Sequence, residues 1–163
     1  MNQKVIELKG VSIYQPQGAV TVLNSGNYRR RGELVLSDVN LEVSRGEMVY
    51  FIGRVGSGKS SLLRTLYAEM PLLEGEGSVA GFDLRTIPTR KIPMLRRRLG
   101  IVFQNYRLLT DRNVFENLHF VMKATGWQRE DDMRKRIDEV LTITGLQNKA
   151  YKMPYELSGG QQQ

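Results

Sequence analysis

Residues 53–60 read Gly-Arg-Val-Gly-Ser-Gly-Lys-Ser, a glycine-rich stretch that ends in a lysine and a hydroxyl. Glycine, four residues, glycine, lysine and then serine or threonine is the pattern of a phosphate-binding loop. Such a loop wraps successive backbone N–H groups around a polyphosphate. Its glycines allow the dihedral angles and the close approach that a Cβ atom would block. The stretch therefore predicts a site for the phosphates of a nucleotide.

The residue types at the end of the loop predict a division of roles. Lys59 adds a full positive charge at the β- and γ-phosphates, and Ser60 offers a hydroxyl to Mg²⁺. A helix that begins near Lys59 points its free N–H groups at the same phosphates. The predicted nucleotide contacts of the loop are Gly53, Arg54, Val55, Gly56, Ser57, Gly58, Lys59, Ser60 and Ser61.

The sequence also predicts the strand and the helix that must position this loop. Residues 48–52, Met-Val-Tyr-Phe-Ile, are an apolar run typical of a strand, and residues 61–70 carry a helical pattern stopped by Pro71. Strand, glycine loop and helix is the context in which the pattern marks a real site. A chance match in a glycine-containing loop is the alternative that this context disfavours.

Periodicity predicts the remaining elements. Strands are expected at residues 5–8 (an edge strand), 34–43, 78–80 and 101–103, with a further strand at 19–23 inside a long hairpin loop. Turns are expected at 45–47 and 74–77, and helices at 94–99, 114–124 and 130–144, the last ended by Gly145. The predicted fold class is α/β, with an antiparallel β portion at the front and a helical portion at the back.

Composition narrows the function classes. The 163 residues suit one domain, and the absence of cysteine excludes disulfides and thiolate metal sites within them. No apolar run is long enough to cross a bilayer, and the N-terminus does not begin like a signal peptide, so a cytosolic chain is expected. The formal charge of +7 suits phosphate ligands, anionic lipid or nucleic acid. The arginine triplets at 29–31 and 96–98 lack interleaved aromatics, which favours a solvated face or an anionic membrane surface over nucleic-acid recognition.

Three further features carry a family resemblance: Tyr14 at a strand end, Gln104 after residues 101–103, and Leu-Ser-Gly-Gly-Gln at 157–161. With the phosphate loop, and in this order, they resemble the nucleotide-binding domain of ABC-type ATPases over residues 5–163. The resemblance implies a P-loop NTPase fold, incomplete at the C-terminus. About residues 1–103 would form the antiparallel β subdomain and P-loop core. About 104–163 would form the Gln104 loop, the helical subdomain and the signature stretch.

Within that family, residues 92–104 and 108–117 resemble the bacterial cell-division ATP-binding proteins of the FtsE type. The Leu-Arg-Arg approach to Gln104 and the Leu-Leu-Thr-Asp-Arg-Asn-Val run are the more particular features. Lipoprotein-release and macrolide-export ATPases share part of this pattern.

The resemblance also implies roles for single residues. Tyr14 would stack on adenine, or else be an ordinary strand-end aromatic. Gln104 would reach Mg²⁺ and the attacking water, and so be catalytic together with Lys59. Residues 105–117 would contact the membrane partner, or else form a plain surface loop and helix cap. The residues that would act in trans, closing over ATP held by a second copy in a homodimer, are Ser158, Gly159, Gly160 and Gln161.

The family also carries a strand ending in Asp-Glu and a switch histidine after the signature stretch. Neither is among the 163 residues, and the only histidine, His119, precedes the signature and is expected to be a helix-surface residue. This stretch alone is therefore expected to hydrolyse ATP poorly.

The function that the resemblance implies is that of an ATP-binding subunit coupled to an FtsX-like integral membrane protein in cell division, at the cytoplasmic face of the bacterial inner membrane. ATP and Mg²⁺ are the implied cofactors. Three alternatives stay open: a transport ATPase of the lipoprotein-release or macrolide-export type, a non-catalytic module in which ATP only gates assembly, and a basic nucleic-acid binder.

Overall fold

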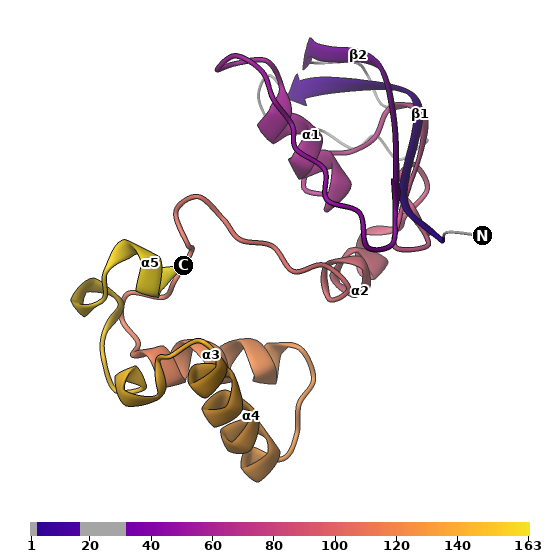
Figure 1. The fold of residues 1–163 in the computed structure, drawn as a ribbon. Coiled ribbons are helices and arrows are strands. Elements are labelled where there is room, and N and C mark those ends of the chain that lie inside the picture. The colour runs from indigo at the N-terminus through magenta and orange to yellow at the C-terminus, as the bar shows by residue number, and fades with distance from the viewer. Residues whose placement is uncertain (1–2, 17–31) are drawn as a thin grey trace. The chain divides into compact units, whose positions relative to one another are not determined.

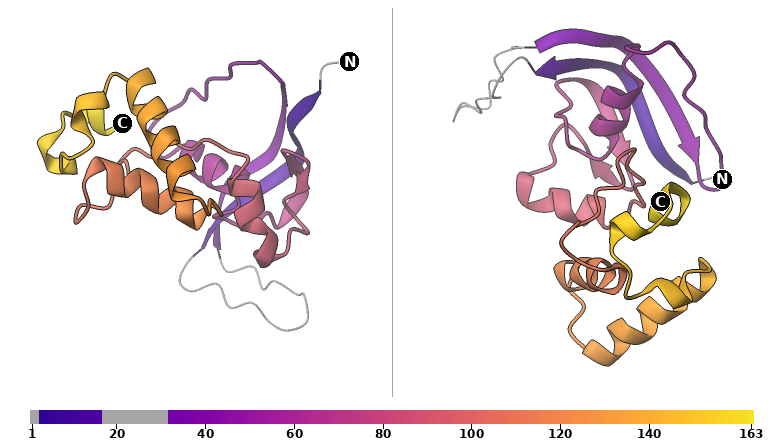
Figure 2. Two further views of the ribbon diagram at one scale, coloured as in Figure 1. Left: turned by 90° about the horizontal axis from the view of Figure 1, so that it is seen from below. Right: turned by 90° about the vertical axis from the view of Figure 1, so that its left-hand side faces the viewer.

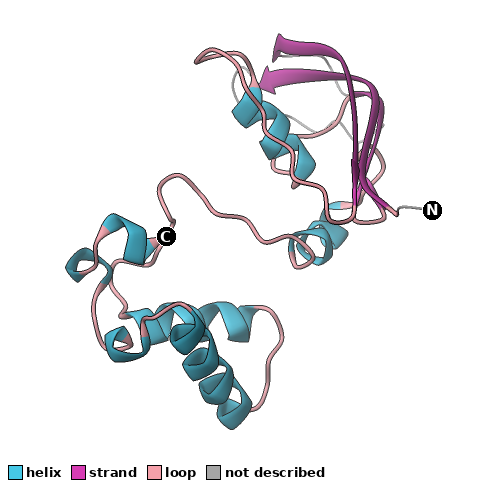
Figure 3. Cartoon of the chain, viewed as in Figure 1, coloured by secondary structure: helices cyan, strands magenta, loops and turns pink. Residues whose placement is uncertain are grey.

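The computed structural model describes residues 3–16 and 32–163, and the chain divides into two compact units, Met1–Gly100 and Ile101–Gln163. Among the described residues the strands lie in the first unit, and the second carries helices and loops alone (Figure 3). The strand expected at 19–23 and the arginine triplet at 29–31 lie outside the described residues.

A four-stranded antiparallel sheet organises the first unit (Figure 1). Its strands, in the order β2-β1-β3-β4, are β1 (Lys4–Pro16), β2 (Gly32–Ser44), β3 (Glu74–Val79) and β4 (Phe82–Asp83). The prediction of an edge strand at residues 5–8 is wrong, because β1 pairs with both β2 and β3. Alternation of apolar and polar residues indicates that one face of the sheet is in solvent. Edge strands and interior strands both show this pattern, so it does not tell them apart.

Helix α1 (Lys59–Leu66) covers one face of this sheet (Figure 2). Its buried side chains Leu62 and Leu66 join a core to which α2 (Ile92–Arg96) contributes the fully buried Leu95. The core residues that the strands supply are Leu8, Val11, Ile13 and Val79. The core therefore sits between the sheet and the helix that follows the phosphate loop.

Two predicted features of the first unit are wrong in position. The helix expected at 61–70 ends at Leu66, and Ala68 is already in the left-handed region with φ 54°. The turn expected at 74–77 lies inside β3 instead. A Cβ on Gly75 would come within 2.5 Å of the Gly10 carbonyl oxygen, so this glycine serves close approach of β3 to β1, not a turn.

The second unit contains the two predicted helices, α3 (Val114–Ala124) and α4 (Glu130–Ile143). Helix α4 buries the apolar stripe Met133, Ile137 and Leu141, as its period predicts. Gly145 ends it with φ 71°, its N–H donating to the Thr142 carbonyl at 3.1 Å. The shorter elements are η1 (Thr89–Lys91) in the first unit and η2 (Gln147–Lys149), η3 (Pro154–Glu156) and α5 (Gly159–Gln162) in the second.

No helix formed by the described ranges, 3–16 and 32–163, combines the length and the apolar character that crossing a bilayer requires.

A cluster of three charged or titratable side chains joins α3 to the start of α4. Glu130 accepts from Lys123 Nζ at 2.8 Å and lies 2.7 Å from His119 Nε2. The His119 ring in turn stacks on Phe115, with centroids 5.7 Å apart. The hydrogen bond from Lys123, followed by that from His119, lowers the pKa of Glu130 from 4.5 to about 2.

This depressed pKa predicts that the stability contributed by the contacts between α3 and α4 depends on pH. Because the folded pKa lies below the ordinary value, Glu130 contributes stability that is fully present above about pH 4.5 and is lost as pH falls through about 2. We expect Glu130→Gln to lower the free energy of unfolding near neutral pH and to match wild type near pH 2. Urea unfolding across that range measures the difference.

The matched control is Asp131→Asn, which removes the same charge from the same first turn of α4. An equal loss in both variants would mean that only the helix-terminal charge matters, and not the contacts with Lys123 and His119.

Candidate phosphate-binding loop and signature stretch

The Lys59 side chain folds back over its own loop. Its Nζ donates to the carbonyl oxygens of Gly53 at 2.8 Å and Arg54 at 2.7 Å, and to Ser57 Oγ at 3.3 Å. These acceptors are neutral, so they hold the ammonium group at the loop without cancelling its charge. An anion that enters the loop would meet a positive charge already positioned there.

The start of α1 adds backbone donors to that charge. Gly58 is the N-cap with φ 86°, it makes no side-chain cap, and the first turn of α1 contains no acidic residue. The first N–H groups of a helix have no partner within the helix, and the helix dipole favours an anion beside them. Ser60 lies in this same turn. The arrangement fits phosphate oxygens, with a hydroxyl available to a cation bound to them.

Gly58 also has a structural role that the sequence pattern does not reveal. Gly58 is buried and packs closely against β2. A Cβ added there would lie 2.8 Å from both Leu36 Cγ and Val35 Cγ1, so only glycine fits. The backbone of the loop therefore rests directly on the sheet. Gly56, by contrast, has φ 82°, and a Cβ added to it would meet no atom within 4 Å. One glycine serves packing and conformation, and the other conformation alone.

The strand predictions for residues 48–52 and 101–103 are wrong. Residues 48–52 form no strand, and Ile52 is 94% exposed. Residues 101–103 form none either, and Val102 is 68% exposed. A strand exists only as part of a hydrogen-bonded ladder, and no described residue pairs with either run. The prediction rested on the apolar composition of the two runs, which does not show whether another segment pairs with them.

Tyr14 lies on β1 opposite Leu34, and its hydroxyl donates to Glu74 Oε2 at 2.7 Å. The tyrosine is half-buried and ties β1 to the first residue of β3. The contact gives Tyr14 a structural role in the sheet. Stacking on adenine remains a prediction.

Gln104 lies in the second unit, exposed at the start of a sharp turn. Tyr106 and Arg107 follow with φ 55° and 51°, two successive non-glycine residues in the left-handed region. The Arg107 guanidinium lies 4.0 Å from the centroid of the Phe103 ring and braces this turn. The catalytic and metal-binding roles of Gln104 remain predictions.

Asn117 is the residue of this segment that sequence reasoning missed. Its Nδ2 donates to the carbonyls of Leu109, Arg112 and Asn113, each at 3.0 Å, and its Oδ1 accepts the Leu109 N–H at 2.8 Å. Asn113 caps α3 in a reciprocal capping box with Glu116. Asn-x-x-Glu is a readable capping signal, whereas nothing in the sequence marks Asn117 as the centre of four hydrogen bonds.

The signature stretch begins α5. Ser158 is its N-cap: Oγ accepts the Gln161 N–H at 3.4 Å, and the Ser158 N–H donates to Gln161 Oε1 at 3.1 Å. Leu157 is buried, whereas Gly159 and Gly160 are exposed. The signature stretch therefore has three parts. Leu157 is buried, the side chains of Ser158 and Gln161 each bond to the backbone of the other, and Gly159 and Gly160 are exposed.

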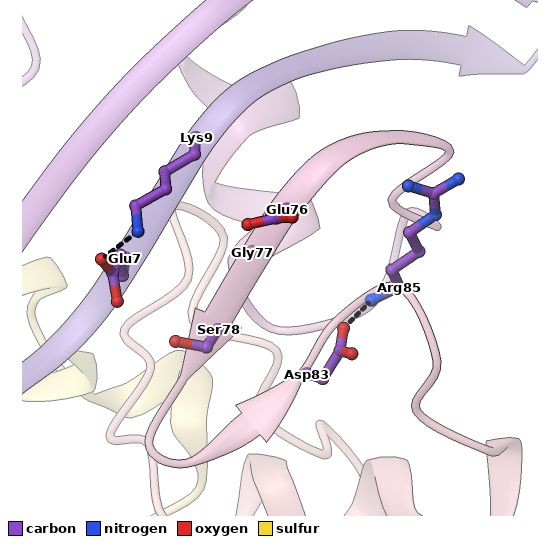
Figure 4. Close-up of a pocket in the computed structure, with 7 residues that line it drawn as sticks. All are labelled: Glu7, Lys9, Glu76, Gly77, Ser78, Asp83 and Arg85. Carbon is purple, nitrogen blue, oxygen red and sulfur yellow. Dashed lines mark hydrogen bonds and ion pairs between the residues drawn. The ribbon is translucent and has the colours of Figure 1, made fainter.

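A polar hollow of about 350 Å³ lies on the sheet, outside all the predicted site residues (Figure 4). Lys9 pairs with Glu7 at 2.9 Å, and Asp83 accepts the Arg85 N–H at 2.8 Å. That backbone hydrogen bond, above all, lowers the pKa of Asp83. Within this hollow Lys9 and Glu7 pair with each other, and no group of three or more His, Cys, Asp or Glu in the described part of the chain is placed to hold a metal.

The chain is similar to a protein family and to known ATP-binding proteins. A family model described as "ABC transporter" matches residues 36–163. The cell division ATP-binding protein FtsE of Streptococcus pneumoniae serotype 2 (strain D39 / NCTC 7466) is 42% identical over 132 residues, 81% of this chain and 57% of that protein. Methionine import ATP-binding protein MetN 2 of Salmonella choleraesuis (strain SC-B67) is 39% identical over 128 residues, 78% of this chain and 38% of that protein.

A solved structure agrees in fold. The dimeric post-hydrolysis state of the ATP-binding cassette MJ0796, bound to ADP and Pi, matches with a TM-score of 0.77 and 27% identity. The match covers 96% of this chain and 65% of that chain. The chain thus spans 57% of the FtsE relative and 65% of the solved cassette.

The two loop glycines predict different costs of substitution. Gly58→Ala and Gly56→Ala both place a side chain at positive φ, which costs about 1–2 kcal/mol. Only Gly58→Ala also forces Leu36 and Val35 aside. We therefore expect a clearly larger fall in the free energy of unfolding for Gly58→Ala, measured by urea denaturation. Equal losses would show that the contact with β2 does not constrain the loop.

Proposed function

The chain belongs to the ABC transporter family, and on this premise we propose that it binds ATP at the loop of residues 53–61. The single observation that carries the proposal is the position of Lys59 Nζ, held by neutral oxygens beside the uncapped start of α1. Charge and backbone donors converge there on the space that a triphosphate tail would fill. Tyr14 is the proposed stacking partner of the adenine ring.

A magnesium ion is part of this proposal. The proposed protein ligands are the Ser60 hydroxyl and the Gln104 side chain. Mg²⁺ keeps several waters and is commonly held by few protein oxygens together with substrate phosphates, so this sparse donor set suits it. When bound, the ion would neutralise charge that develops during phosphoryl transfer. Gln104 would also orient the attacking water, and the reaction of the whole protein would be ATP hydrolysis.

We further propose that the nucleotide joins two copies of the chain head to tail. Ser158, Gly159, Gly160 and Gln161 of one copy would face the ATP held by Lys59 of the other. The exposure of both signature glycines supports this, because their backbone can be approached closely. The dimeric state of the MJ0796 cassette in the presence of ADP and Pi supports it by similarity.

For the whole protein we propose an FtsE-like role: an ATPase on the cytoplasmic face of the bacterial inner membrane, coupled to an FtsX-like integral membrane protein through residues 105–117. The FtsE relatives support this choice. An import or export ATPase is the second candidate, favoured by the methionine import relative at 39% identity. Purification of the native complex separates them, since an FtsX-like partner supports the first and a solute permease the second.

Lys59→Ala tests the phosphate site. Loss of a charge-assisted contact to phosphate, about 1.5–3 kcal/mol, predicts a fall in ATP affinity of about ten- to a hundredfold. Titration calorimetry with Mg-ATP measures it. Lys91→Ala is the control, because it removes a surface cation outside the loop and should leave affinity unchanged. Undiminished ATP affinity in Lys59→Ala would contradict the proposal.

A mixture of two inactive variants tests the head-to-tail dimer. Lys59→Ala and Ser158→Ala each damage both sites of a homodimer, in different halves of each site. A mixed dimer keeps one site in which Lys59 and Ser158 are both intact. We expect ATP-dependent dimerisation, followed by light scattering, to be weak for each variant and to recover in the mixture. No recovery would argue that Ser158 does not act in trans.

A further inference from the structure

Arg96, at the end of helix α2, contacts the C-terminal end of helix α1. Its Nε donates to the Tyr67 carbonyl and its Nη2 to the Ala68 carbonyl, both at 3.1 Å. Tyr67 is the C-cap of α1, and Ala68 is the next residue. One guanidinium therefore contacts the C-terminal end of α1, the helix whose N-terminal end follows the loop of residues 53–58.

The chemistry of this contact is favourable. The last carbonyls of a helix, here including that of the C-cap Tyr67, lack partners within it and carry partial negative charge, so a nearby cation stabilises them. The second donor of Arg96 holds the Ala68 carbonyl, just beyond the helix. A guanidinium offers two donors in a rigid fork, and an ammonium does not. The residue before Arg96, Leu95, is fully buried in the core. The backbone that bears the guanidinium is therefore anchored, and α1 is held from a fixed point.

We call the two hydrogen bonds from Arg96 to the Tyr67 and Ala68 carbonyls the Arg96 brace. The short length of α1 links this brace to the loop. The helix has only 8 residues, so its two ends are about 12 Å apart along one short, stiff element. Gly58 fixes the near end against β2, and Arg96 fixes the far end. Without the Arg96 contact, the far end of α1 would be held only by its buried side chains, such as Leu62 and Leu66. We expect the direction of its first N–H groups and of Lys59 to become less fixed.

A neighbouring arginine provides a comparison. Arg98 Nη1 donates to the Ala80 carbonyl at 3.3 Å, and its guanidinium lies 5.4 Å from the centroid of the Phe82 ring. This contact also ties residues 96–98 to another part of the first unit, but at the turn between β3 and β4. The sequence interpretation of the triplet as a solvated or membrane-facing patch therefore missed contacts to backbone carbonyls made by two of its members.

We propose that Arg96 is a positioning residue for phosphate binding: by bracing the C-terminal end of α1, it sets how the loop and Lys59 present themselves to a nucleotide. The ligand in this statement rests on the proposed function. The brace itself is a property of the chain without nucleotide.

The test compares Arg96→Ala and Arg96→Lys with Arg98→Ala in the full chain. Hydrogen exchange without nucleotide reports local opening of α1, and calorimetry reports Mg-ATP affinity. We expect Arg96→Ala to raise the exchange rates of the amides at 62–66 by about tenfold, and to weaken ATP binding by about fivefold or more. Arg96→Lys, which keeps the charge but loses the fork, should lie between it and wild type.

Arg98→Ala should raise exchange at the turn of residues 80–81 and leave both α1 and ATP affinity within about twofold of wild type. Faster exchange of α1 to the same extent in Arg96→Ala and Arg98→Ala would overturn the proposal, since general destabilisation would then explain it. Wild-type exchange and affinity in Arg96→Ala would overturn it as well. A wild-type chain without ATP affinity would refute the proposed function, while the exchange rates would still decide whether Arg96 braces α1.

Discussion

The contact between the backbone of Gly58 and strand β2 is the constraint on which the first unit depends. A buried glycine with positive φ turns the chain from the loop into α1, and the absence of a Cβ lets that turn rest on Leu36 and Val35. Because α1 starts there, its buried face meets the sheet and its uncapped N–H groups face outward. Packing and the proposed phosphate binding thus use the same residue for two different reasons.

The groups proposed to act on ATP lie in both units. The first unit contains the charged loop, and the second contains Gln104 and the signature stretch. In the second unit the elements are tied by local hydrogen bonds: the Asn117 side chain closes the loop before α3, and Ser158 and Gln161 cap α5 reciprocally. Local bonding of this kind can keep short segments in shape without a large core. It holds the segment before α3 and the start of α5 in defined local conformations.

Helices α3 and α4 were predictable because their signals are local. Capping residues, period and a terminal glycine all lie within a few residues of the element they define. The glycine-rich pattern of residues 53–60 is local in the same way, and its binding of phosphate stays a prediction. Residues 48–52 and 101–103 were not, because a strand depends on partners elsewhere in the chain. Gly75 was misassigned to a turn, and the hydrogen bonds of the exposed Arg96 were missed, since only the fold places the Gly10 and Tyr67 carbonyls beside these residues.

The central claim is that the backbone amides of residues 56–60 and the Lys59 ammonium bind the phosphate tail of a nucleotide. Amide chemical-shift changes in isotopically labelled chain, titrated with Mg-ATP and separately with adenosine, test it most directly. We expect large shifts at Gly56, Gly58, Lys59 and Ser60 with Mg-ATP and none with adenosine. The absence of shifts at these amides on saturation with Mg-ATP, or equal shifts with adenosine, would contradict the account.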